Sequence, residues 1–199
     1  MVLAAGESSR FGRNKLLEPF YGRPLVHHAV AAAMDSRLAR VVVVLGNESD
    51  RVEAALAPLD RDDRLGFVVN EAFAAGQSTS VIAGLNAIGD KIDAVMFLLA
   101  DQPAVTATIL DRLIAAFEGE DRMICLPTWG GQRRNPVIFG ARYFPALRAL
   151  TGDAGGRSVI ETNPDDVTAV PFDDAIPFRD VDREDDLETL VHLTEGERS

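Results

Sequence analysis

The sequence predicts an α/β protein with a mostly parallel sheet. Two short apolar runs, 41–45 and 94–99, have the length and composition of strands that are buried on both faces. A weaker run of the same kind covers 67–69. Helical patterns lie between these runs, and strands that alternate with helices favour right-handed βαβ units. Ligands of such sheets bind beyond the carboxyl ends of the strands, so residues that directly follow these runs are the first site candidates.

The first half of the chain begins with a short apolar strand at 3–5 that leads into a glycine-containing loop. Helical patterns follow at 24–34, 49–56 and 80–88. Pro24 suits the first turn of its helix, where no backbone N–H is needed. Ser78 or Thr79 suits the N-cap of the third helix, because a hydroxyl there accepts from a free backbone N–H.

After about residue 120 the composition changes. We expect strands at 123–126 and 136–139, separated by a polar loop at 128–135, and helices at 144–150, 158–162 and 184–193. The segment 178–182 is expected to end a strand. This half therefore adds antiparallel or mixed strands. The sequence predicts one domain over residues 1–193, followed by a polar tail at 194–199.

Length and composition narrow the classes of protein that are possible. A chain of 199 residues with 47% hydrophobic residues can bury one sizeable core. No apolar run approaches the ~20 residues of a membrane span. The net charge of −11 disfavours a nucleic-acid partner, whose phosphates need many basic side chains. The single cysteine, Cys125, excludes an intrachain disulfide and favours a cytoplasmic location.

The loop after the first strand is the most informative segment. Gly6 ends a run of small residues, and Ser8, Arg10 and Lys15 follow in an otherwise acidic chain. Such a loop, which we expect to be exposed, presents backbone N–H groups and positive charge to an anion, usually a phosphate. The spacing matches neither the Walker A loop nor the dinucleotide-binding glycine pattern. The alternative is an ordinary surface turn with scattered basic residues.

The pattern Leu-Ala-Ala-Gly-x-Ser-x-Arg-x-Gly-x-x-Lys at 3–15 resembles the signature loop of the NTP transferases that include the MobA and MocA molybdenum-cofactor enzymes. The resemblance implies a Rossmann-like three-layer αβα sandwich of the nucleotide-diphospho-sugar transferase type, with a mixed, mostly parallel sheet. It also implies a nucleotide-binding half at 1–105 and an acceptor-binding half at 106–193. Members with Ala-Ala-Gly in this loop are associated with CTP and those with Leu-Ala-Gly-Gly with GTP, so the sequence favours CTP.

This resemblance assigns the nucleotide site. Arg10, Lys15 and Asp101 are the expected catalytic residues, with the two cations on the triphosphate. The expected nucleotide-binding residues lie in the first loop and in the segment 76–80: Leu3, Ala4, Ala5, Gly6, Ser8, Arg10, Lys15, Ser78 and Ser80. A hydroxyl in 78–80 could equally serve only as a helix cap.

The sequence also suggests a site for Mg²⁺ or Mn²⁺. Asp101 follows the strand 94–99, and a carboxylate at that end of a strand can bind a hard cation, although a turn-forming aspartate before Pro103 is the alternative. An acidic cluster covers 180–186, and its C-terminal members suit the dipole of the helix that follows. The resemblance to the motif Asp-x-Asp-Thr-Pro-Glu-Asp-Leu assigns the second metal ligand to Asp182, with Asp180 as the alternative.

Two further segments match motifs of the acceptor side. The stretch 130–137 resembles Arg-Gly-x-Pro-Val, with Arg134 where a glycine is usual, and 152–157 resembles Gly-Asp-x-Gly-x-Arg. The expected acceptor-binding residues are therefore Arg133, Asn135, Asp153, Gly155 and Arg157. Solvated glycine turns are the alternative for both segments.

The family chemistry is attack of an acceptor phosphate on the α-phosphorus of a nucleoside triphosphate, with release of pyrophosphate. The resemblance favours a molybdopterin-like acceptor and, as a further partner, a molybdoenzyme apoprotein. A sugar phosphate or methylerythritol phosphate is the alternative acceptor. An accessory protein that binds the cofactor without turnover is the alternative of another class. The presence of Arg10, Lys15 and Asp101 argues for an active enzyme.

Overall fold

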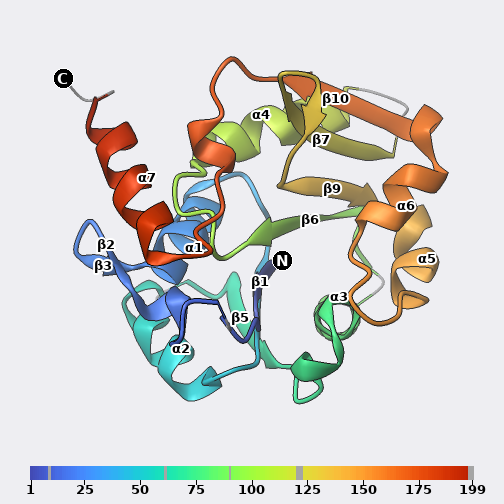
Figure 1. Cartoon of the computed structure of the whole chain (residues 1–199). Coiled ribbons are helices and arrows are strands. Elements are labelled where there is room, and N and C mark those ends of the chain that lie inside the picture. Colours follow the sequence, from blue (N-terminus) through green and yellow to red (C-terminus); the bar gives the residue numbers. More distant parts are fainter. Residues whose placement is uncertain (9, 61, 90, 120–122, 197–199) are drawn as a thin grey trace.

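A computed structural model describes residues 1–8, 10–60, 62–89, 91–119 and 123–196. Within these residues the main sheet has eight strands, in the order β10-β7-β9-β6-β1-β4-β5, with β8 paired to β7 outside this path (Figure 1). The strands are β1 (Val2–Ala4), β4 (Val41–Leu45), β5 (Leu65–Val69), β6 (Ala94–Leu99), β7 (Ile124–Trp129), β8 (Gln132–Arg133), β9 (Val137–Gly140) and β10 (Val167–Pro171). A small separate hairpin consists of β2 (Pro19–Phe20) and β3 (Arg23–Pro24).

The central strand β1 is parallel to both of its neighbours. Leu3 is in register with Val44 of β4 on one side and with Leu99 of β6 on the other. Strand β9 is antiparallel to β6 and β7, and β10 is parallel to β7. The sheet is therefore mixed and mostly parallel, as predicted. Because β1 and β6 end side by side, the first loop lies next to Asp101.

Helices cover both faces of this sheet and produce three layers (Figure 1). They are α1 (Leu25–Asp35), α2 (Ser49–Leu56), α3 (Gln77–Ile88), α4 (Ala107–Glu118), α5 (Phe144–Arg148) and α6 (Arg157–Thr162); a further helix is α7 (Glu184–Gly196). Apolar residues of α1, α2 and α4 belong to one core cluster, and those of α3, α5 and α6 belong to a second. The expected αβα sandwich is confirmed.

Helix α7 packs outside these layers, beside the β2–β3 hairpin (Figure 1). Its Leu190 joins Phe11, Phe20, Leu25 and Val181 in a third, smaller core cluster. This contact connects the C-terminal segment to the first loop, so the acidic stretch before α7 is carried to the same edge of the sheet as Asp101.

Several local expectations are corrected. Helix α3 begins at Gln77 with Gly76 as its N-cap and no side-chain cap, so neither Ser78 nor Thr79 has the expected capping role. Pro24 is the N-cap residue of α1 instead of lying in its first turn. The polar loop at 128–135 contains the short strand β8.

The C-terminal part differs most from expectation. The segment 178–182 is not a strand. It follows a 3-10 helix at Ile176–Phe178, and the Val181 N–H donates to the Asp101 carbonyl at 3.0 Å. Strand β10 was not predicted from the sequence. Helix α7 extends to Gly196, into the segment expected to be a tail, and residues 197–199 lie outside the described part of the chain.

None of the helices in the described residues has the length and apolar character needed to cross a bilayer.

Candidate active site

The first loop is held in a defined path by side-chain hydrogen bonds. Ser8 has a positive φ of 54°, and its hydroxyl accepts from the Lys15 N–H at 3.2 Å. Asn14 is buried; it accepts from the Leu16 N–H at 3.1 Å and donates to the Asn47 carbonyl at 3.2 Å. These bonds fix the start of the 3-10 helix Lys15–Leu17 and therefore the position from which the Lys15 side chain extends.

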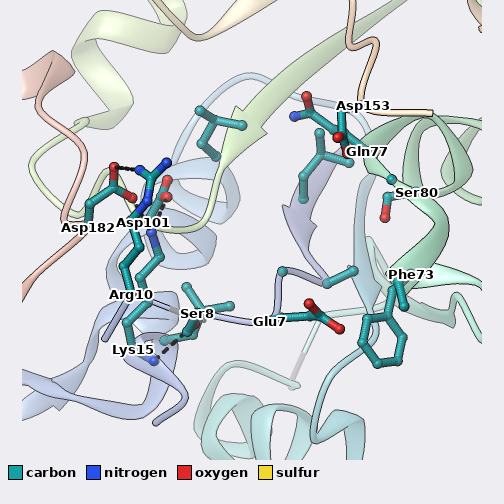
Figure 2. Close-up of a pocket in the computed structure, with 17 residues that line it drawn as sticks. Glu7, Ser8, Arg10, Lys15, Phe73, Gln77, Ser80, Asp101, Asp153 and Asp182 are labelled. Carbon is teal, nitrogen blue, oxygen red and sulfur yellow. Dashed lines mark hydrogen bonds and ion pairs between the residues drawn. The ribbon is translucent and has the colours of Figure 1, made fainter. Parts of the chain in front are cut away.

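Lys15 lies between two carboxylates. Its Nζ is 2.7 Å from Asp101 Oδ2 and 2.9 Å from Asp182 Oδ1 (Figure 2). The side chain is only 13% exposed, so the expectation of an exposed Lys15 is wrong, whereas Arg10 is 72% exposed as expected. Burial by itself would lower the pKa of Lys15, but the charges and hydrogen bonds of the two aspartates outweigh it and raise the pKa above its usual value.

The three aspartates at this edge of the sheet have different environments. Asp182 Oδ2 accepts from Arg10 Nη1 at 3.4 Å, and the hydrogen bond from Lys15 is the main reason that the pKa of Asp182 is lowered. Asp180 accepts from Gln102 Nε2 at 2.8 Å instead. Burial, with the nearby charge of Asp101, raises the pKa of Asp180 to about 6. The sequence left Asp180 and Asp182 as alternatives for the second metal ligand. Of these two, Asp182 is the one that contacts the same Lys15 ammonium as Asp101 does.

The donor set is suitable for a hard divalent cation. Asp101 Oδ1 is buried and has no hydrogen-bond partner among the described residues, so a cation bound between Asp101 and Asp182 would satisfy an oxygen that Lys15 leaves without a partner. No group of three or more His, Cys, Asp or Glu side chains in the described part of the chain forms a ready metal site. A cation held by Asp101 and Asp182 would therefore take its remaining ligands from water and from the substrate.

A cleft of about 460 Å³ begins at these charged groups (Figure 2). One end carries Arg10, Lys15, Asp101 and Asp182, and the other is lined by Glu7, Phe73 and Ser80; its further lining comes from Leu3, Ala5, Gly6, Ser8, Leu16, Ala74, Gly76, Gln77, Leu99 and Asp153. The cleft thus has a charged end suited to phosphates and a partly aromatic end suited to a base.

The hydroxyl of Ser80 is positioned at that second end. Asn70 is buried, donates to Ser80 Oγ at 3.0 Å and accepts from the Ala72 N–H at 3.1 Å. Its amide also donates to Thr79 Oγ1 at 2.8 Å. Asn70 therefore fixes the orientation of the Ser80 hydroxyl, which lines this end of the cleft.

A second cleft of about 590 Å³ adjoins the first. Its walls include the apolar side chains of Phe97 and Phe139, whose ring centroids are 5.2 Å apart, together with Val81, Leu126, Val137 and Ile160. All five expected acceptor residues line it: Arg133, Asn135, Asp153, Gly155 and Arg157. This cleft therefore combines an apolar floor with a polar, partly cationic rim.

The arginines of this rim are not equivalent. Arg157 is paired with Glu161 at 2.7 Å. Arg134 donates to Gln132 Oε1 at 2.9 Å and lies over the Trp129 ring at 5.7 Å. Arg134 has no positive φ, so the loop does not need the glycine that is usual at this position. For the Arg133 guanidinium the structure records no hydrogen bond or ion pair within the described residues, so this group is free to bind an anion.

The two clefts share part of their lining, namely Leu3, Gln77, Leu99 and Asp153. Figure 2 shows Gln77 and Asp153 close together, across the first cleft from Lys15. Gln77 was not predicted as a site residue, because the sequence analysis assigned nucleotide binding in this segment to the hydroxyls of Ser78 and Ser80. The feature of the sequence that could have identified Gln77 is its position in the 76–80 segment, at a helix N-terminus.

Two predicted residues line neither cleft: Ala4 is in the core and Ser78 is buried.

Comparison with known protein families agrees with this arrangement. A family model described as "MobA-like NTP transferase domain" matches residues 1–167. Purine catabolism protein PucB of Bacillus subtilis is 31% identical, with 81% of this chain and 80% of that protein covered. Nicotine blue oxidoreductase of Paenarthrobacter nicotinovorans is 30% identical, with 96% and 95% covered. The names of these two relatives refer to different areas of metabolism.

Solved structures resemble the whole chain. The homologue of Mycobacterium tuberculosis Rv0371c from Mycobacterium sp. strain JC1 has a TM-score of 0.83 at 29% identity and covers 98% of this chain and 95% of its own. Rv0371c of Mycobacterium tuberculosis H37Rv, solved as a complex with manganese, has a TM-score of 0.78 at 26% identity, with 96% of both chains covered.

Proposed function

Because this chain belongs to the MobA-like NTP transferase family and is a nucleotidyltransferase, we propose that it transfers CMP from CTP to a phosphorylated, molybdopterin-like acceptor. The observation that carries the acceptor class is the apolar floor of the second cleft. A planar heterocycle gains from contact with the apolar lining of this cleft, of which Leu3 and Leu99 are partly exposed, whereas a polyhydroxylated sugar phosphate would leave its hydroxyls against apolar side chains. The product would pass to a molybdoenzyme apoprotein, the partner that the family resemblance implies.

The proposed reaction is an in-line displacement at phosphorus. An oxygen of the acceptor phosphate forms a bond to the α-phosphorus of CTP, and the bond from that phosphorus to the bridging β-oxygen breaks, which releases pyrophosphate. The acceptor phosphate is already ionised at neutral pH, so no protein group has to remove a proton. The task of this chain is to align the two substrates and to offset the charge that develops on the triphosphate.

The charged end of the first cleft supports this task. Arg10 is exposed toward the cleft and can donate to the triphosphate, while Lys15 lies beside it (Figure 2). Asp101 and Asp182 would hold Mg²⁺ or Mn²⁺, which supplies charge neutralisation at the phosphates when it is bound. The complex of Rv0371c with manganese supports a divalent cation in this family.

The preference for CTP has a steric basis in the loop. Ala5 is 5% exposed and lines the first cleft. A side chain added at Gly46 would lie 2.7 Å from Ala5 Cβ and 2.8 Å from Phe73 Cβ, so these three residues are closely packed. The methyl group of Ala5 occupies space that a glycine would leave to a larger purine, and the Ser80 hydroxyl can pair with the edge of a pyrimidine.

Release of pyrophosphate provides the test. The purified protein is incubated with Mg²⁺ and with CTP, GTP, ATP or UTP, each against molybdopterin-type and methylerythritol-phosphate-type acceptors. We expect turnover with CTP and the heterocyclic acceptor. Turnover only with the sugar-type acceptor would refute the acceptor class, and a preference for GTP would refute the base assignment. Absence of pyrophosphate release with every pair would refute the proposed reaction.

A further inference from the structure

Lys15 occupies the position between Asp101 and Asp182 that a divalent cation would need. Its Nζ is within hydrogen-bond distance of one oxygen of each carboxylate, at 2.7 and 2.9 Å. No other described lysine or arginine bridges these two groups. Arg10 is 3.4 Å from Asp182 but has no recorded contact with Asp101. The ammonium of Lys15 is thus the internal counter-ion of the aspartate pair.

The backbone of Lys15 is fixed, but its side chain is not tied to anything else. The Lys15 N–H is bonded to Ser8 Oγ, and the 3-10 helix is capped by Asn14. The four methylene groups of the Lys15 side chain can therefore change rotamer and move the ammonium while the backbone stays in place. Arg10, Ser8 and Gly6 line the same cleft, so a triphosphate bound there is within the region that this stem can sweep.

Binding of a metal–nucleotide complex would require Lys15 and the two carboxylates to exchange ionic partners. Two carboxylates at one partly buried position need a counter-charge, and Lys15 provides it. A metal complex of the triphosphate brings both a new cation for the carboxylates and new anionic oxygens for the lysine. Each group then has a partner before and after binding, and no charge is left without one.

We propose that Lys15 is a place-holder for the metal: its ammonium excludes the divalent cation from Asp101 and Asp182 until a nucleotide draws it onto the phosphates. The inference rests on the proposed function for the identity of the nucleotide and the metal. It makes metal binding dependent on nucleotide binding, so that the aspartate pair does not hold a cation without substrate.

Binding of Mn²⁺ without nucleotide tests the proposal directly. The wild-type protein, Lys15→Met and Lys15→Gln are titrated with Mn²⁺, and free Mn²⁺ is followed by electron paramagnetic resonance. Apparent affinity falls by the fraction of molecules that are competent to bind, so an occupancy of ~90% by the lysine would correspond to roughly tenfold tighter binding once it is removed. We expect the two Lys15 variants to bind Mn²⁺ more tightly by a factor of this order.

Arg10→Met is the matched control, because it removes a positive charge beside Asp182 without emptying the position between the carboxylates. We expect it to change Mn²⁺ affinity much less than Lys15→Met does. Equal tightening by both variants would reduce the effect to net charge and overturn the proposal, as would unchanged or weaker binding in both Lys15 variants. In Lys15→Met with Asp101→Asn, the tighter site should be lost; its survival would place the cation elsewhere and also overturn the proposal.

The titration involves no turnover, so its result is independent of the proposed reaction. If pyrophosphate release fails with every pair of substrates while Lys15→Met binds Mn²⁺ more tightly, then the reaction is wrong and the place-holder role stands. If release is observed and the variants bind Mn²⁺ no more tightly than the wild type, then the reaction stands and the place-holder role is wrong.

Discussion

Substitution of Gly76 by alanine tests how the two clefts are joined. Gly76 precedes α3, and a Cβ added there would lie 2.3 Å from the Gly152 carbonyl carbon and 2.4 Å from its oxygen. Ordinary contacts to carbon are ~3.5 Å, so the 152–156 segment would have to retreat by roughly 1 Å. The bond from the Ser78 N–H to the Gly152 carbonyl, 3.1 Å long, would be broken by this movement.

Gly89 is a matched control at the other end of the same helix. Gly76 has φ 111° and ψ 167°, and Gly89 has φ 81° and ψ −175°, a region of backbone space that is accessible almost only to glycine. A Cβ at Gly89 meets no atom within 4 Å. Both alanine variants therefore carry the backbone strain of ~1–3 kcal/mol, but only Gly76→Ala carries the contact as well.

We expect Gly76→Ala to be less stable than Gly89→Ala by about 3 kcal/mol, from overpacking of ~1–3 kcal/mol and a lost hydrogen bond of ~1 kcal/mol. Urea unfolding of the two variants measures this difference. Since a displacement of ~1 Å can reduce rate ~10²-fold, kcat/KM should fall strongly in Gly76→Ala and stay near wild type in Gly89→Ala. Equal stability and equal kinetics in the two variants would refute the contact between α3 and the acceptor segment.

Four further predictions can be measured with the same preparations. Arg10→Ala should reduce kcat by ~10²–10³-fold through loss of a preorganised charge, with an unchanged urea midpoint because the side chain is exposed; wild-type kcat would contradict this. Asp101→Asn should abolish the Mg²⁺-dependent activity, and full activity of the wild type in excess chelator would contradict the metal assignment. Gln77→Glu, which adds a negative charge where both clefts meet, should lower kcat/KM far more than Gln132→Glu at the rim of the second cleft, and equal effects would remove Gln77 from the junction. Burial raises the pKa of Cys125 from 9.0 to about 11, so the unfolded thiol ionises first and the contribution to stability is lost as pH rises from about 9 to 11. In urea unfolding, the stability difference between wild type and Cys125→Ala should therefore shrink by about 1 kcal/mol between pH 8 and pH 10, and a constant difference would contradict the shift.

The sequence alone predicted most of the sheet and of its covering helices. Strands β4 and β6 are continuous apolar runs, and α2 has the bounds expected from its pattern. These elements are recognisable because each depends on residues that are near one another in the chain. Strand β10 was missed, since its short alternating segment is stabilised by pairing with β7, which precedes it by about 40 residues in the sequence.

The chemical types at the site were also predicted from sequence: a glycine-containing cationic loop, a carboxylate after β6 and a cluster of acids before α7. The tertiary structure alone decided their pairing. Lys15 meets Asp101 and Asp182, which are 86 and 167 residues away in the chain, and becomes buried instead of exposed. The order of the strands and the packing of α7 determine these distances. Local sequence patterns fix secondary structure and residue chemistry, whereas burial and charge pairing depend on which distant segments pack together.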